Sequence, residues 1–170
     1  MLTDLDEMCA AGVTHILDNR MECNDEQLVT LAAPHVRYLH NGQDDRGQAM
    51  PDVWFDRGVG FSLVALDTPG TAVLAHCHMG INRGPSMAYA IMLALGEDPV
   101  QALQLIRAAR PIAAIAYSHD ALAWWHRATG TPPAESEGQM LAIQRWHRDN
   151  WIDVRRIIRQ VRREEAGLNH

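Results

Sequence analysis

Cys77 and Arg83 lie six positions apart in the part of this sequence most suited to chemistry. Residues 71–86 have the sequence TAVLAHCHMGINRGPS, and the small, partly β-branched start of this segment is typical of a buried strand. Pro85 favours the first turn of a helix, where no backbone N–H is needed. The pattern predicts that Cys77 and Arg83 belong to a loop between a strand and a helix N-terminus.

Such a loop can bind a phosphate group and activate a thiol. Backbone N–H groups at the helix start converge on one concavity, and the helix dipole adds positive potential there. The same surroundings lower the pKa of a cysteine thiol. Gly80 permits a tight turn, and Arg83 can direct two N–H donors to phosphoryl oxygens. We expect Cys77 to act as a nucleophile beneath a bound phosphate.

Two simpler interpretations compete with this one. A cysteine is often only a small core residue. Alternatively, His76, Cys77 and His78 could bind a metal, but neighbouring side chains of an extended segment point to opposite faces and rarely ligate together. The sequence predicts neither a metal nor another cofactor.

Residues 76–83, HCHMGINR, resemble the HCxxGxxR signature of the cysteine-based protein tyrosine phosphatases, and most of all that of their dual-specificity branch. The resemblance implies an α/β fold with a central, mostly parallel sheet flanked by helices. It implies a phosphatase that acts on phosphotyrosine, phosphoserine and phosphothreonine in proteins through a phosphocysteine intermediate. The residues that it assigns to phosphate binding are His78, Met79, Gly80, Ile81, Asn82 and Arg83.

The resemblance also implies a general acid about thirty residues before the cysteine, because the leaving oxygen needs a proton. Asp45 lies 32 positions before Cys77 and fits best, with Asp44 as the alternative and Asp52 more distant. Both Asp44 and Asp45 could instead be ordinary turn residues in a glycine-flanked loop.

The sequence departs from the family pattern beside the signature. The family carries serine or threonine after the arginine, where this chain has Gly84; the missing hydroxyl predicts slow hydrolysis of the intermediate, which Gly84→Ser should accelerate. Ser86 could supply a substitute hydroxyl, and His76 is expected to orient the loop. The family's Pro-Asn pair after the next helix is missing as well.

Other functions remain open. Asn82 before the arginine is shared with RNA 5′-phosphatases and triphosphatases, and Gly84 would suit a catalytically weak module that binds phosphoproteins. His78 and Met79 are uncharged, whereas phosphoinositide-directed relatives carry extra lysines in the loop, so the resemblance disfavours lipid substrates.

Hydrophobic periodicity predicts a β-α-β arrangement for the body of the chain. We expect strands over 13–17, 36–40 and 71–75, and helices over 4–11, from 24 or 25 to 33, and over 52–66, 84–95, 100–109 and 119–129. In the helix over 52–66, the expected core contacts are Phe55, Phe61, Val64 and Leu66.

The predicted catalytic domain covers residues 1–130, a short linker covers 131–138, and 139–170 forms a long amphipathic helix docked on the domain. This last segment contains seven arginines and four acidic residues, a net charge of +3 in a chain of net charge −6. Its arginines could bind an acidic partner, RNA or an anionic membrane surface, although nucleic acid is a weaker expectation and a solvated arginine face on a docked helix is the favoured interpretation.

We found no apolar stretch long enough for a membrane span and no signal peptide. Three cysteines form an odd number in such a chain, which favours reducing conditions and a cytoplasmic location.

Overall fold

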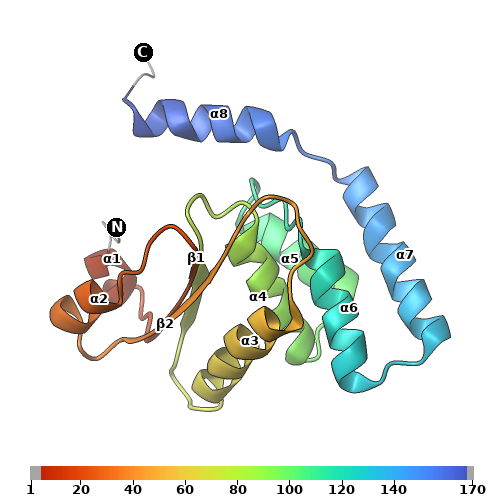
Figure 1. Ribbon diagram of the computed structural model, residues 1–170, viewed down its shortest axis with the longest axis horizontal. Coiled ribbons are helices and arrows are strands. Elements are labelled where there is room, and N and C mark those ends of the chain that lie inside the picture. Colours follow the sequence, from red (N-terminus) through yellow and green to blue (C-terminus); the bar gives the residue numbers. More distant parts are fainter. Residues whose placement is uncertain (1–4, 168–170) are drawn as a thin grey trace.

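The computed structural model describes residues 5–167 and has a three-stranded parallel sheet at its centre (Figure 1). The strands are β1 (His15–Arg20), β2 (Arg37–Gln43) and β3 (Val73–His76), in the order β2-β1-β3. The expected α/β class with a parallel sheet is confirmed.

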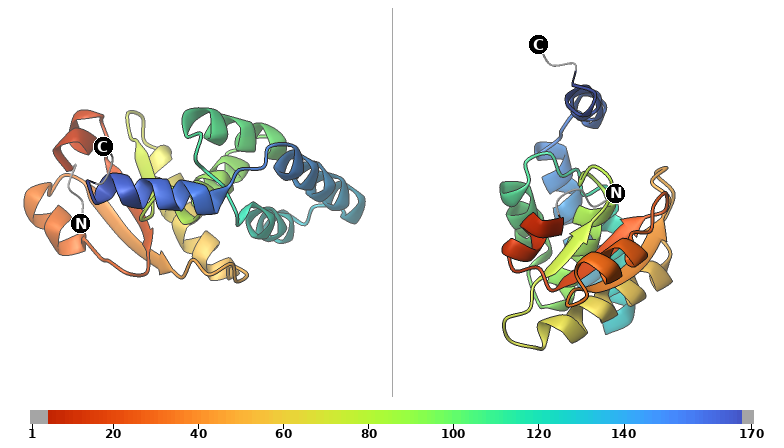
Figure 2. Two further views of the ribbon diagram at one scale, coloured as in Figure 1. Left: turned by 90° about the horizontal axis from the view of Figure 1, so that it is seen from above. Right: turned by 90° about the vertical axis from the view of Figure 1, so that its left-hand side faces the viewer.

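The described part of the chain also contains eight helices. They are α1 (Leu5–Ala10), α2 (Glu26–Ala32), α3 (Asp52–Leu66), α4 (Arg83–Ala94), α5 (Pro99–Ala109), α6 (Ser118–Thr129), α7 (Pro133–Asp149) and α8 (Val154–Glu165). Helices α1 and α2 lie on one side of the sheet, and α3 and α4 on the other (Figures 1 and 2). Helices α5 and α6 pack on α4, and α7 packs on both of them.

The central strand β1 is covered on both faces. Its side chains alternate, so that Ile16 packs with Val29 in a small cluster beneath α1 and α2, whereas Leu17 packs with Phe55 and Met87 in the main core. All five of these residues are fully buried. Because β1 is sandwiched in this way, its position in the sheet is firmly determined.

The strand order places the switch point of the sheet at the carboxyl ends of β1 and β3. After β1 the chain passes to α2 on one face, and after β3 it passes to α4 on the other face. The two loops therefore diverge, and open α/β sheets bind their ligands at such a point. The signature loop, residues 77–82, follows β3 and lies in this position.

The structure corrects three expectations. Val64 is 78% exposed and is not a core contact, whereas Phe55 is buried. Most of the segment expected to be a linker, 131–138, is helical, because α7 begins at Pro133. The single helix expected over 139–165 is two helices, since the Asn150 side chain donates to the Trp146 carbonyl and Asp153 caps α8.

Two glycines of α3 give a matched stability test. A Cβ at Gly58 would lie 2.5 Å from the Met87 sulfur and 3.0 Å from the Asn41 amide nitrogen, whereas a Cβ at the exposed Gly60 would meet nothing within 4 Å. We expect Gly60→Ala to raise the free energy of unfolding by about 0.5–1 kcal/mol. Gly58→Ala should lower it, because overpacking costs about 1–3 kcal/mol. Urea denaturation measures both, and equal stabilisation would contradict the packing argument.

Candidate active site

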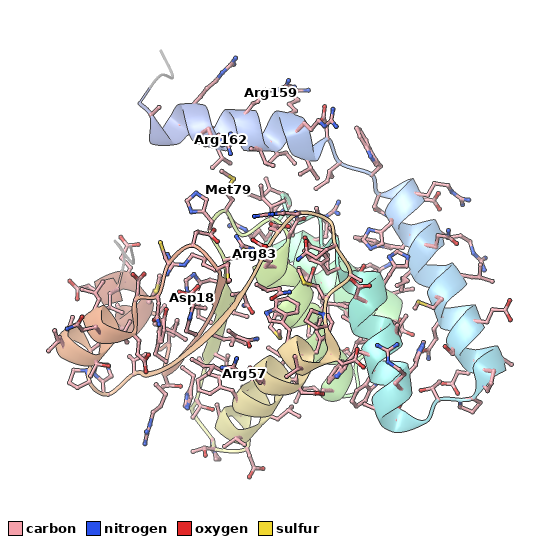
Figure 3. All side chains as sticks on the ribbon, viewed as in Figure 1. Asp18, Arg57, Met79, Arg83, Arg159 and Arg162 are labelled. Atoms are coloured by element: carbon pink, nitrogen blue, oxygen red, sulfur yellow. The ribbon has the colours of Figure 1, made fainter. Side chains whose placement is uncertain are left out.

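The signature loop curls between β3 and α4, with the Cys77 side chain 8% exposed (Figure 3). Gly80 has a φ of +64°, a left-handed conformation that favours glycine. Arg110, which follows α5, donates from Nε to the Gly80 carbonyl at 2.8 Å and from Nη2 to the Met79 carbonyl at 2.7 Å. A Cβ at Gly80 would lie 2.5 Å from Arg110 Nε. Arg110 therefore supports the loop from its outer side.

The connection between α5 and α6 supports the loop a second time. The Ile81 carbonyl accepts from the backbone N–H of Ala114 at 2.8 Å and of Ile115 at 3.3 Å. Ile115 is fully buried and has a φ of +55°, which is rare for a β-branched residue. These backbone bonds support the loop although the family's Pro-Asn pair is missing.

Arg83 is 5% exposed, and its guanidinium joins the ends of the strands. Nη1 donates to the backbone carbonyls of Asn19 and Gln43 at 3.3 and 2.9 Å, and both Nη atoms donate to the Glu22 carboxylate at 2.8 Å. Burial acts to lower the pKa of Arg83, but the hydrogen bond and charge of Glu22 raise it overall. Arg83 Nε has no hydrogen-bond partner and lies 3.6 Å from Asp45 Oδ2. This donor is available to a phosphoryl oxygen.

Glu22 is a site residue that no motif of the sequence identifies. It lies in the loop after β1, and the hydrogen bond from Arg83 lowers its pKa to about 2. The residue is 61 positions from Arg83, so no local pattern connects them. Only its place after a strand at the switch point of the sheet could have suggested a site residue.

Of the candidate acids, the structure brings Asp45 to the loop. Its Oδ1 accepts from the Tyr117 hydroxyl at 2.6 Å and from Asn82 Nδ2 at 3.3 Å. Burial, followed by the bond to Asp45, raises the pKa of Tyr117 to about 12, so this hydroxyl keeps its proton and remains a donor. Asp44 instead lies 3.7 Å from Arg46 on the surface.

The more distant alternative, Asp52, lies at the start of α3 and forms a two-pronged ion pair with Arg127 at 2.5 and 3.0 Å. Both side chains are about half exposed. Asp52 is thus held away from the signature loop.

His76 is a half-buried neighbour of the cysteine. Burial lowers its pKa, although Asp18, 3.7 Å away, acts in the opposite direction, and its ring bonds to the Cys77 backbone. Burial would raise the pKa of Asp18, but hydrogen bonds from Arg20 and Tyr38 lower it overall. The expected role of His76 as an orienting residue fits this geometry.

Gly84 and Ser86 differ from what the family pattern would require. A Cβ at Gly84 would lie 3.0 Å from the His76 backbone and 3.1 Å from the Ala75 carbonyl, so Gly84→Ser requires β3 or α4 to shift. The buried Ser86 hydroxyl accepts from the Tyr117 N–H at 3.1 Å. Gly84→Ser therefore changes the position of the loop as well as adding a hydroxyl.

Within residues 5–167, no group of three His, Cys, Asp or Glu side chains is placed to hold a metal ion. The three cysteines of the chain are free thiols. The variable loop residue His78 is exposed, while Met79 is partly buried.

The fold of this chain resembles that of solved structures. No known sequence family and no curated protein matches the chain. Solved structures do match, among them PTPMT1 in complex with PI(5)P, with 19% identity and a TM-score of 0.56 over 75% of this chain and 87% of that chain. DUSP15 matches with 18% identity and a TM-score of 0.59 over 84% of this chain and 85% of that chain.

The chain has the dual-specificity phosphatase fold. Within this fold the phosphatase-like signature loop, Arg83 and Asp45 meet at the carboxyl edge of the sheet.

The Glu22–Arg83 pair predicts a pH dependence of stability. The pKa of Glu22 is about 2 in the folded protein against 4.5 for the free side chain. A depressed carboxyl pKa stabilises the fold above the unfolded pKa, and this stabilisation disappears as the pH falls through the folded pKa. We expect the difference in unfolding free energy between wild type and Glu22→Gln to shrink as the pH falls from about 4.5 to about 2.

Urea unfolding across this pH range measures that difference. Asp52→Asn is the control, because it removes a carboxylate of an exposed ion pair that solvent screens, and we expect a smaller effect. A Glu22→Gln difference that stays constant with pH would contradict the assignment.

Proposed function

We propose that this protein is a cysteine-dependent phosphatase that hydrolyses phosphate monoesters. The observation that carries the proposal is the unpartnered Nε of buried Arg83, at the end of the loop that begins with Cys77. A buried donor without a partner is costly, and a phosphoryl oxygen would satisfy it. The loop also starts α4, whose N-terminal N–H groups favour an anion.

In the proposed reaction the Cys77 thiolate attacks phosphorus opposite the leaving oxygen. The S–P bond forms, the P–O ester bond breaks, and Asp45 gives its proton to the leaving oxygen. Water then attacks the phosphocysteine, Asp45 takes the proton of that water, and the S–P bond breaks to release phosphate. Tyr117 and Asn82 orient the Asp45 carboxyl for both steps.

We propose phosphotyrosine, phosphoserine and phosphothreonine side chains of proteins as the substrate class. The Glu22 carboxylate lies beside Arg83 and offsets its charge, and the loop side chains His78 and Met79 add no fixed positive charge. This balance suits a single phosphate and disfavours a headgroup with several. The Asn82 amide contacts Asp45, which accounts for this residue without an RNA substrate.

The nucleophile is tested by Cys77→Ser. We expect loss of aryl phosphate hydrolysis to background with retained binding of inorganic phosphate, because the loop N–H groups and Arg83 remain. Phosphate release and isothermal calorimetry measure the two properties. Turnover near the wild-type rate without added metal would refute the covalent mechanism.

The neighbouring aspartates provide a matched test of the acid. We expect Asp45→Asn to lower kcat for a phenyl phosphate by about 10²–10⁴-fold, the usual contribution of a general acid. Asp44→Asn removes the same charge one residue away and should leave kcat nearly unchanged. Steady-state kinetics decides, and a larger loss in Asp44→Asn would move the role to Asp44.

The substrate class is tested with the wild-type protein on phosphotyrosine, phosphoserine and phosphothreonine peptides, PI(5)P and 5′-triphosphate RNA. We expect the highest kcat/KM on a phosphopeptide. Preference for the lipid or the RNA would overturn the proposed class but not the mechanism.

A further inference from the structure

Helix α8 makes no polar contact with the body of the molecule in the described part of the chain. It leaves α7 at residues 150–153 and crosses above the end of the molecule that carries the signature loop (Figures 1 and 2). Among the described residues, none from 151 onward has a hydrogen bond or ion pair with the body. None of the described side chains of α8 is fully buried, and none belongs to either core cluster.

The sequence of α8 nevertheless separates two kinds of side chain. Four apolar residues lie on one side at helical spacing and remain partly exposed: Val154, Ile157, Ile158 and Val161. Five exposed arginines occupy the other side, and none has an ion pair with a described residue: Arg155, Arg156, Arg159, Arg162 and Arg163. Trp151, just before the helix, is 74% exposed.

Such a helix needs an external surface for stability. A helix of 12 residues is marginal by itself in water, because few backbone bonds offset the cost of nucleation. The body of the protein supplies only part of this packing, because the four apolar residues stay partly exposed and belong to neither core cluster. The separation of apolar and cationic faces therefore points to a partner that satisfies both.

An anionic lipid bilayer satisfies both faces. RNA or an acidic protein surface would pair with the arginines but leave the apolar stripe in water. In a bilayer the stripe contacts acyl chains while the arginines lie among the headgroup phosphates. An exposed tryptophan such as Trp151 favours the same interface. The charge agrees, since residues 139–170 carry +3 in a chain of net charge −6.

We propose that Trp151 and α8 form a membrane-docking arm that lies in the surface of an anionic bilayer. In Figure 3 Arg159 points away from the body, so the apolar stripe on the opposite side of α8 faces the body. The arm exposes it by turning about residues 150–153. The last hydrogen bond to the body is there, from Arg107 Nη1 to the Asn150 carbonyl at 3.0 Å.

The arm lies on the membrane rather than crossing it: no described helix is both long and apolar enough to span a bilayer. The proposal does not depend on catalysis, and its test uses no activity.

Co-sedimentation of the full chain with vesicles tests the arm. We expect binding to phosphatidylcholine vesicles with ~30% phosphatidylglycerol at about 0.1 M salt, and weak binding to pure phosphatidylcholine. The double variant Arg159→Gln/Arg163→Gln should bind about 30-fold more weakly. The matched control, Arg145→Gln/Arg148→Gln, removes two exposed arginines of α7 and should bind like wild type.

A second variant tests the apolar stripe. Ile158→Asn/Val161→Asn keeps all arginines and should lose binding, whereas its thermal unfolding midpoint should match that of wild type because neither residue is in the core. Three results would each overturn the proposal. They are no binding to anionic vesicles, an equal loss in the α7 control, or undiminished binding by the apolar variant, which would indicate an acidic partner instead.

Discussion

The buried guanidinium of Arg83 is the interaction on which the site depends. Its Nη atoms reach the carbonyl of Asn19 in β1, the carbonyl of Gln43 in β2 and the carboxylate of Glu22, while Arg83 itself follows β3. A cation with 5% exposure is tolerated only when its donors are paired. One side chain thus joins the carboxyl ends of all three strands, and the signature loop lies at that junction.

The same junction explains the charges around the loop. Glu22 offsets much of the charge of Arg83, and Nε has no hydrogen-bond partner. Asp45 Oδ2 lies 3.6 Å from Arg83 Nε and forms an ion pair with it. Hydrogen bonds from Tyr117 and Asn82 determine the orientation of the Asp45 carboxyl group. The site therefore sets the carboxyl groups of Glu22 and Asp45 against one buried cation, and this balance supports the proposed substrate with a single phosphate.

Stability and attachment are distributed unevenly over the molecule. One continuous core joins the sheet, α3, α4 and the helices packed on them. Arg110 and the backbone of residues 114–115 support the signature loop from that side. Helix α8 has no comparable contacts, although its amphipathic sequence is the most sharply divided of the chain. Its sequence is better explained by an external surface than by the fold.

The sequence by itself determined the features that depend on local spacing. The strand, loop and helix around Cys77 follow from hydrophobic periodicity, Pro85 and Gly80, and the parallel α/β class follows from alternating apolar segments. These patterns act within a few residues, so they can be recognised without the fold. The helix expected over 52–66 has the same bounds in the structure for this reason.

Only the tertiary structure decided which distant side chains meet. Asp44 and Asp45 are neighbours of equal chemistry, and the packing of Tyr117 against their loop brings Asp45, not Asp44, to Arg83. Glu22 and Arg110 reach the loop from other segments. The break between α7 and α8 arises because Asn150 and Asp153 bond the local backbone, which the apolar periodicity running through them conceals. Such contacts depend on how loops pack in space, and no pattern along the chain predicts this packing.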